Sequence, residues 1–175
     1  RAAHGSMAQP LGQSLRGGTQ TRGRIFVRTA PEVQSLKQAV EQSVNSHWDG
    51  MPAYDATHPL LRHRKARPKF DGSWSVRLTS AGFHVQHIHP NGLLSSACYL
   101  ALPDNTEDLE HKEGWLELGR AAPDLGWDME PIAQFQPRLG LQALFPSSLF
   151  HGTRPFKKGE RITVAFDIVS DEMSQ

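Results

Sequence analysis

The sequence has few of the features that mark secreted, disulfide-stabilised or membrane proteins. Its 175 residues include a single cysteine, Cys98, so an internal disulfide framework is excluded. Because Cys98 lies in an apolar run, we expect a buried thiol rather than a reactive one. No apolar stretch approaches the roughly 20 residues that a membrane-spanning helix needs, and no signal peptide is visible. These absences favour a cytoplasmic protein.

Charge and short motifs exclude further classes of partner. The formal net charge is only +1, so the field of the whole molecule does not favour a polyanion. A basic run at residues 62–69, RHRKARPK, could attract an acidic substrate or nucleic acid. No interleaved aromatic residues accompany it, and we interpret it as a solvated loop. There is no phosphate-cradling glycine loop and no C-x-x-C pair, so nucleotide-binding and zinc-ribbon functions lack support. We expect no nucleic-acid partner and no membrane contact.

The chain is long enough for one domain with a sizeable core. Residues 1–7, RAAHGSM, look like an expression remnant, and we assign residues 8–175 to the domain. Residues 9–23 have no helical or strand period, so we expect an extended arm there, either on the surface or lining a pocket. Residues 29–48 carry apolar side chains at spacings of three and four. This pattern predicts a helix whose apolar stripe packs on the outer face of a sheet.

From residue 73 onward the pattern is that of short strands separated by proline and glycine. Trp74, Val76 and Leu78 alternate with polar residues, and a tight connection at Ala81 and Gly82 is expected to lead into a second strand. The remaining predicted strands cover residues 83–89, 93–102, 114–118, 132–136, 139–145 and 161–169. Such a series with one helix in front predicts an all-β fold with a flanking helix, a sandwich or jelly roll.

Two histidines near the middle of the chain have the spacing of metal ligands. On a strand His87 and His89 point to one face, whereas His84 points to the other and is interpreted as a structural or surface histidine. Two imidazoles on one face can bind a single metal ion, although backbone groups or water could satisfy them instead. A third histidine, His151, lies between strand-like segments and precedes Arg161 by ten residues. Together these residues indicate a candidate site.

The last predicted strand carries an arginine on its polar face. Alternation places Arg161, Thr163 and Asp167 on one side and apolar residues on the other. An arginine in this setting needs a partner, and a carboxylate that accepts two hydrogen bonds from the guanidinium satisfies it best. The sequence therefore favours recognition of a carboxylate at Arg161.

These motifs together resemble those of the iron- and 2-oxoglutarate-dependent oxygenases. The resemblance rests on the H-x-H motif, on FPSSLFHGTRPF, on the R-I-T that starts the last strand, and on QSLRGGTQT, SWSVRL and HPNGLLSSACYLALP. Within this superfamily the chain is most similar to the small bacterial and phage "putative 2OG-Fe(II) oxygenase" group, over nearly its whole native length. The resemblance implies a double-stranded β-helix with Fe(II) at its open end.

The resemblance also implies roles for individual residues. His87, His89 and His151 would bind the metal, with His89 in the position that usually holds a carboxylate. Arg161 would bind the distal carboxylate of 2-oxoglutarate, with the Thr163 hydroxyl beside it. The implied activity is that of a dioxygenase that uses Fe(II), 2-oxoglutarate and O2. It would hydroxylate a small-molecule or peptidyl substrate and release succinate and CO2.

Two further residues are candidates for contact with the cosubstrate. Arg77 either reaches the carboxylate of the cosubstrate or substrate, or is an outward and solvated arginine. Tyr99 either hydrogen-bonds 2-oxoglutarate or belongs to the core. The sequence alone does not choose between these interpretations.

The three histidines depart from the usual triad of two histidines and one carboxylate. Three neutral imidazoles leave an Fe(II) site one unit more positive, which dianionic 2-oxoglutarate can offset in part. His89 could instead lie off the metal. Two alternatives therefore stay open: a cupin-like three-histidine metalloenzyme that does not use 2-oxoglutarate, and a non-catalytic ligand-sensing module. The oligomeric state stays open too, a homodimer included.

Overall fold

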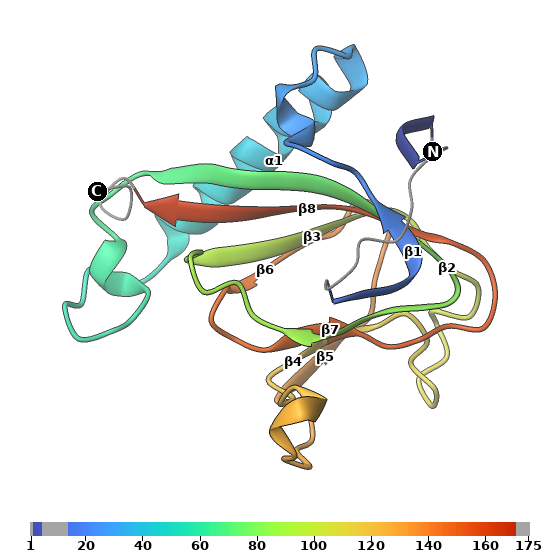
Figure 1. Cartoon of the computed structure of the whole chain (residues 1–175). Coiled ribbons are helices and arrows are strands. Elements are labelled where there is room, and N and C mark those ends of the chain that lie inside the picture. Colours follow the sequence, from blue (N-terminus) through green and yellow to red (C-terminus); the bar gives the residue numbers. More distant parts are fainter. Residues whose placement is uncertain (1, 5–13, 171–175) are drawn as a thin grey trace.

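The computed structural model describes residues 2–4 and 14–170. Within them the chain forms one curled antiparallel sheet of eight strands, with a single long helix on its outer side (Figure 1). This confirms the predicted all-β fold with a flanking helix. Residues 1 and 5–7 of the expected remnant and residues 9–13 of the expected arm lie outside the described residues.

The sheet has the strand order β5-β4-β7-β2-β8-β3-β6, with β1 beside β2. The strands are β1 (Leu15–Gln20), β2 (Pro68–His87), β3 (Leu94–Ala101), β4 (Leu116–Leu118), β5 (Ala133–Phe135), β6 (Gln142–Pro146), β7 (His151–Thr153) and β8 (Arg161–Ser170). The helix is α1 (Pro31–Gly50), and the short 3₁₀ turns are η1 (Ala2–His4), η2 (Ile25–Val27), η3 (Leu61–His63) and η4 (Pro123–Leu125). Two strands, β1 and β7, were not predicted, because β1 lies in the expected arm and β7 has only three residues.

β2 joins the two parts of this sheet. Its first part, to Leu78, pairs with β8, and its last part, His84 and His87, pairs with β7. The predicted connection at Ala81 and Gly82, which would separate two strands, is wrong. β2 continues through both residues, with a φ of 65° at Ala81. We call the first part of β2 with β8, β3 and β6 the long sheet, and the last part of β2 with β7, β4 and β5 the short sheet.

α1 covers the outer face of the long sheet (Figure 1). It starts and ends two residues later than predicted. Val40, Val44 and Trp48 recur on one helical face and are buried in a cluster with Phe166 and Ile168 of β8. Because side chains alternate along a strand, the opposite face of β8 turns its polar residues inward, toward the short sheet.

Cys98 is buried, as expected, and burial raises the pKa of its thiol. His4 lies 2.9 Å from Thr19 Oγ1 and 3.0 Å from Ser75 Oγ through its ring nitrogens, so residues 2–4 contact β1 and β2. Among the described residues, no helix is long and apolar enough to cross a membrane.

Candidate active site

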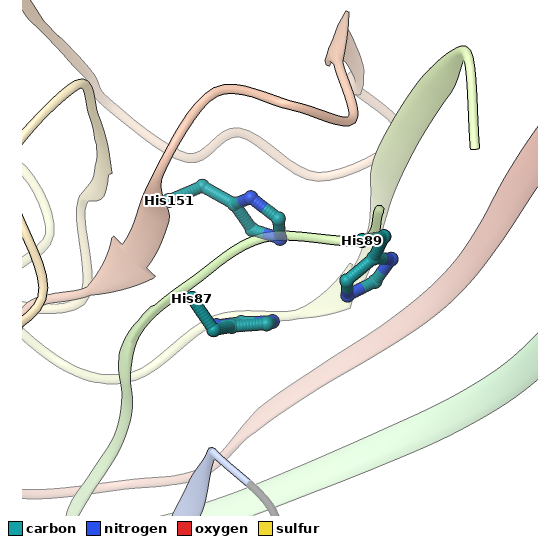
Figure 2. A group of neighbouring side chains, drawn as sticks. All are labelled: His87, His89 and His151. Atoms are coloured by element: carbon teal, nitrogen blue, oxygen red, sulfur yellow. The ribbon is translucent and has the colours of Figure 1, made fainter. Parts of the chain in front are cut away.

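Three histidines from two strand ends lie together at the opening between the long and short sheets (Figure 2). His87 ends β2, His89 follows two residues later, and His151 begins β7 as the register partner of His87. The ring centroids of His87 and His151 are 4.2 Å apart, and His89 lies 5.1 and 5.0 Å from them. One ring nitrogen of each lies within 4.8 Å of the others. The structure thus brings together all three predicted metal ligands.

The hydrogen bonds of these rings define which nitrogen is free. Nδ1 of His87 lies 2.7 Å from the Val85 carbonyl oxygen, and Nδ1 of His151 lies 3.0 Å from the Leu149 carbonyl oxygen. A carbonyl oxygen only accepts, so both Nδ1 atoms carry the proton and donate. The lone pair of a neutral ring then lies on Nε2, which is the form that a metal ion binds. Nδ1 of His89 likewise faces an acceptor, the Asp167 carboxylate, at 2.7 Å.

Burial keeps two of these rings neutral without a metal. It lowers the pKa of His151 to about 3, and the nearby His87 ring adds to that shift. Burial also lowers the pKa of His87, against the opposing effect of its bond to the Val85 carbonyl. A neutral imidazole has its lone pair available, so these rings can bind a metal cation without first losing a proton.

Gly152 allows β7 to approach β2 closely. A Cβ at this position would lie 2.8 Å from the carbonyl oxygen of His84 and 2.7 Å from Nε2 of Gln86. The first of these is a backbone atom and cannot turn away. A glycine directly after His151 is therefore needed for the pairing that brings His151 to His87.

The inward face of the long sheet forms the other end of the same cavity, which has a volume of about 470 Å³ and is lined by the three histidines, Arg161 and Thr163. Arg161 is 3 % exposed, and its guanidinium carbon lies 5.0 Å from the ring centre of Tyr99. Within the described part of the chain, Nε of Arg161 and the hydroxyl of Tyr99 are buried without hydrogen-bond partners. Leaving such groups unsatisfied costs about 1–3 kcal/mol each, more for a charged group, so this end requires an acceptor.

Sequence comparison identifies the family. The family model described as "Putative 2OG-Fe(II) oxygenase" matches residues 72–167, more than half of the chain. The chain belongs to this family. The matched segment contains all three histidines and Arg161, so the similarity covers the two ends of the cavity. No curated protein shows significant sequence similarity to the chain.

Solved structures share the fold of this 2OG-Fe(II) oxygenase. A prolyl-4-hydroxylase from Pseudomonas putida matches with a TM-score of 0.64 and 16% identity, covering 97% of this chain and 80% of that one. A Trichoplax adhaerens prolyl hydroxylase, in complex with a hypoxia inducible factor peptide fragment, gives 0.63 and 14%, covering 98% and 73%. HygX from Streptomyces hygroscopicus, with nickel and 2-oxoglutarate bound, gives 0.60 and 13%, covering 95% and 74%. The predicted double-stranded β-helix is confirmed.

Arg77 does not belong to the cavity of the oxygenase. Its register partner on β8 is Ile162, whereas Val76 is opposite Thr163 and faces inward. The side chain of Arg77 therefore turns to the other face, where Nε donates to Glu160 Oε2 at 2.9 Å. Of its two predicted interpretations, the outward arginine is the one that the structure favours.

His84, in contrast, lies in the cavity, and its assignment to the opposite face is wrong. The register of β2 with β7 advances by three residues from His84 to His87 but by only two on β7, which is a β-bulge. The bulge turns His84 to the side of His87, with ring centroids 5.8 Å apart. Burial, and next the charge of Arg161, hold the pKa of His84 well below its usual value. Its Nε2 is buried with no partner among the described residues.

Asp167 is a residue that the sequence analysis placed on the correct face of the last strand but to which it gave no role. It lies on the inward face of β8 and lines the cavity. Its Oδ1 accepts from His89 Nδ1 and from Ser95 Oγ, each at 2.7 Å. The alternation of β8 could have indicated it, because it shares a face with Arg161 and Thr163.

Proposed function

We propose that this chain is an Fe(II)- and 2-oxoglutarate-dependent hydroxylase of a small-molecule or peptidyl substrate. The observation that carries the proposal is a single cavity with two complementary ends. Three histidines converge at one end, and Arg161, whose Nε is buried without a partner among the described residues, lines the other. 2-Oxoglutarate has a chelating keto acid at one end and a carboxylate at the other, so one molecule would satisfy both.

Each residue has a defined part in this proposal. His87, His89 and His151 would hold Fe(II) as neutral nitrogen donors. Arg161 and the Thr163 hydroxyl would bind the distal carboxylate of 2-oxoglutarate, since both line the cavity. Bound iron, with 2-oxoglutarate and O2, supplies the oxidation that hydroxylates a C–H bond and releases succinate and CO2.

Tyr99 fits the same ligand. It is the register partner of Thr163 on the neighbouring strand, so the two side chains share the inward face. Its hydroxyl would donate a hydrogen bond to the carboxylate that Arg161 holds. A three-histidine metalloenzyme without 2-oxoglutarate would leave this hydroxyl and Nε of Arg161 unpaired, and we therefore prefer the cosubstrate-dependent reaction.

Two observations bear on the class of substrate. The Trichoplax adhaerens relative of this fold was solved with a peptide fragment, which supports keeping a peptidyl side chain among the candidates. Trp74 and Phe145 pack beside the histidines, with ring centres 5.7 Å from His89 and 4.7 Å from His151. These rings would give the reacting end of the cavity apolar walls suited to a C–H group.

Succinate formation tests the proposal. Purified protein is incubated with Fe(II) and 2-oxoglutarate, alone and with mixtures of peptides and small metabolites, and succinate is measured. We expect succinate only when both Fe(II) and 2-oxoglutarate are present, and its loss in Arg161→Ala. Arg77→Ala is the matched control, because it removes an arginine from the neighbouring strand that faces the other side. Equal activity of the two variants would contradict the proposal.

A further inference from the structure

His89 lies beyond the end of β2, where no strand pairing fixes it. Three contacts replace that pairing. Its backbone N–H donates to the Ser147 carbonyl oxygen at 2.9 Å, and its ring Nδ1 lies 2.7 Å from Asp167 Oδ1 and 3.2 Å from Ser95 Oγ. The side chain of Asp167 is only 17% exposed. The orientation of the His89 ring therefore depends on Asp167.

Asp167 is itself fixed by buried hydroxyl groups. Ser95 Oγ lies 2.7 Å from Asp167 Oδ1 and 2.9 Å from Ser147 Oγ, and both serines are at most 1% exposed. A hydroxyl has one proton, and a carboxylate only accepts, so Ser95 donates to Asp167 and Ser147 donates to Ser95. The carboxylate is thus held in one orientation by a chain that also reaches the backbone of His89.

Asp167 also brings a negative charge close to the three histidines. Three neutral imidazoles bring no negative charge to a dication, whereas the usual triad contains a carboxylate. The other carboxylate that lines the cavity, Asp71, is 56% exposed at its side chain and lies 3.3 Å from Arg24. Asp167 has no arginine or lysine within ion-pairing distance in the described part of the chain. Asp167 is therefore the half-buried negative charge that is available to the metal end.

We propose that Asp167 is a positioning residue for the metal site, and that it supplies through His89 the negative charge that the histidine triad lacks. Its bond to Nδ1 fixes the His89 tautomer, directs Nε2 to the cavity and makes that nitrogen a stronger donor. In this arrangement the carboxylate does not bind the metal directly, as in the usual triad, but contacts the metal-binding imidazole of His89. This inference rests on the proposed function only in taking the three histidines as the ligands.

Metal affinity without turnover tests the inference. Metal-free protein is titrated with Co(II), and affinity and the visible absorption spectrum are measured for wild type, D167A and D167N. Loss of an outer-shell partner typically weakens metal binding 10–100-fold, and we expect D167A to fall in that range. D167N keeps an acceptor oxygen but not the charge, and we expect it to bind about tenfold more weakly than wild type. D71N is the matched control at the cavity rim and should bind Co(II) like wild type.

A second experiment restores a carboxylate at the metal itself. In H89D the carboxylate is placed directly at the third ligand position, so removing the charge of Asp167 should no longer weaken binding. We expect H89D/D167N to bind Co(II) at least as tightly as H89D alone, and more tightly than D167N. In the metal-free protein, nitrogen NMR of the imidazoles should show His89 protonated at Nδ1 in wild type and a mixture of tautomers in D167A.

The outcomes separate this inference from the proposed function. Wild-type Co(II) affinity in folded D167N, equal weakening in D71N, or an unchanged His89 tautomer in D167A would overturn the role of Asp167. If wild type binds no Co(II), both proposals fail. If D167A and D167N weaken metal binding as expected but 2-oxoglutarate is never consumed, the role of Asp167 stands and the proposed reaction does not.

Discussion

The long sheet and the short sheet carry the two ends of the cavity, and they are stabilised in different ways. β8 and β3 have 10 and 8 residues and are covered on their outer face by the apolar side of α1. β7, β4 and β5 have three residues each. In the short sheet the buried carboxylate of Glu117 accepts from Gln86, Gln134 and Arg154 at 2.8–3.2 Å. The long sheet thus packs on the apolar side of α1, whereas the short sheet combines a small apolar cluster of Leu116, Leu118 and Phe145 with the polar contacts of Glu117.

The two sheets should respond differently to substitution. A change in the short sheet should weaken metal binding, whereas a change under the long sheet should cost stability and spare the site.

Gly152→Ala should have the largest effect on the site. Its Cβ would meet the His84 carbonyl oxygen, so β7 must move away from β2 and His151 from His87. We expect a loss of about 1–3 kcal/mol in unfolding free energy and at least a tenfold loss of Co(II) affinity, measured by denaturant unfolding and by metal titration. Gly50→Ala is the control, since a Cβ there meets nothing within 4 Å. Wild-type metal affinity in Gly152→Ala would show that the close pairing is not needed.

Acid should destabilise the metal-free protein through its buried histidines. The pKa of His151 is about 3 in the folded state, and those of His84 and His87 are also lowered. Between pH 6.5 and 3 the unfolded chain binds protons that the folded chain does not, so unfolding free energy falls as the pH falls. The slope is about 1.4 kcal/mol per pH unit for each such proton. Denaturant unfolding across this range should show it, with a smaller slope in His151→Gln. An identical slope in that variant would contradict the assignment.

Val44→Ala should reduce stability and leave the site intact. Val44 is 2% exposed and packs in the cluster under β8. We expect a loss of about 2 kcal/mol in unfolding free energy, with Co(II) affinity unchanged. A parallel loss of metal affinity would mean that the two sheets are not as independent as the comparison states.

Arg77→Ala should have the smallest effect. Arg77 and Glu160 form a partly exposed ion pair on the face away from the cavity, which is worth less than about 1 kcal/mol. Affinity for 2-oxoglutarate, measured by calorimetry on Co(II)-loaded protein, should equal that of wild type. Weaker binding would return Arg77 to the list of cosubstrate contacts.

The strands of the long sheet could be predicted from the sequence because their polar and apolar side chains alternate regularly. Arg161, Thr163 and Asp167 share one face of β8 because its ten residues form one continuous strand. The helix was predicted for a similar reason, since its apolar spacing extends over several turns. Long elements with one buried face leave a periodic signal, and that signal placed Arg161 and Thr163 on the face of β8 that lines the cavity.

Local irregularities explain what the sequence did not reveal. The bulge between His84 and His87 reverses the face of His84, and no side-chain pattern encodes it. β2 continues through Ala81, which has a positive φ, where glycine suggested a connection. The hydrogen bond from His89 to Asp167 joins residues far apart in the chain. Each depends on tertiary pairing, which a single sequence does not specify.

The central claim is that the histidines and Arg161 bind the two ends of one molecule. Calorimetric titration of 2-oxoglutarate into metal-free and Co(II)-loaded protein, for wild type and Arg161→Ala, tests it most directly. Removing one partner of a buried charged pair costs about 3–5 kcal/mol, so we expect Arg161→Ala to weaken binding to the Co(II)-loaded protein by roughly 10²–10⁴-fold, with wild-type binding strong only when Co(II) is present. Equal affinity with and without Co(II), or in the presence and absence of the Arg161 guanidinium, would contradict the account.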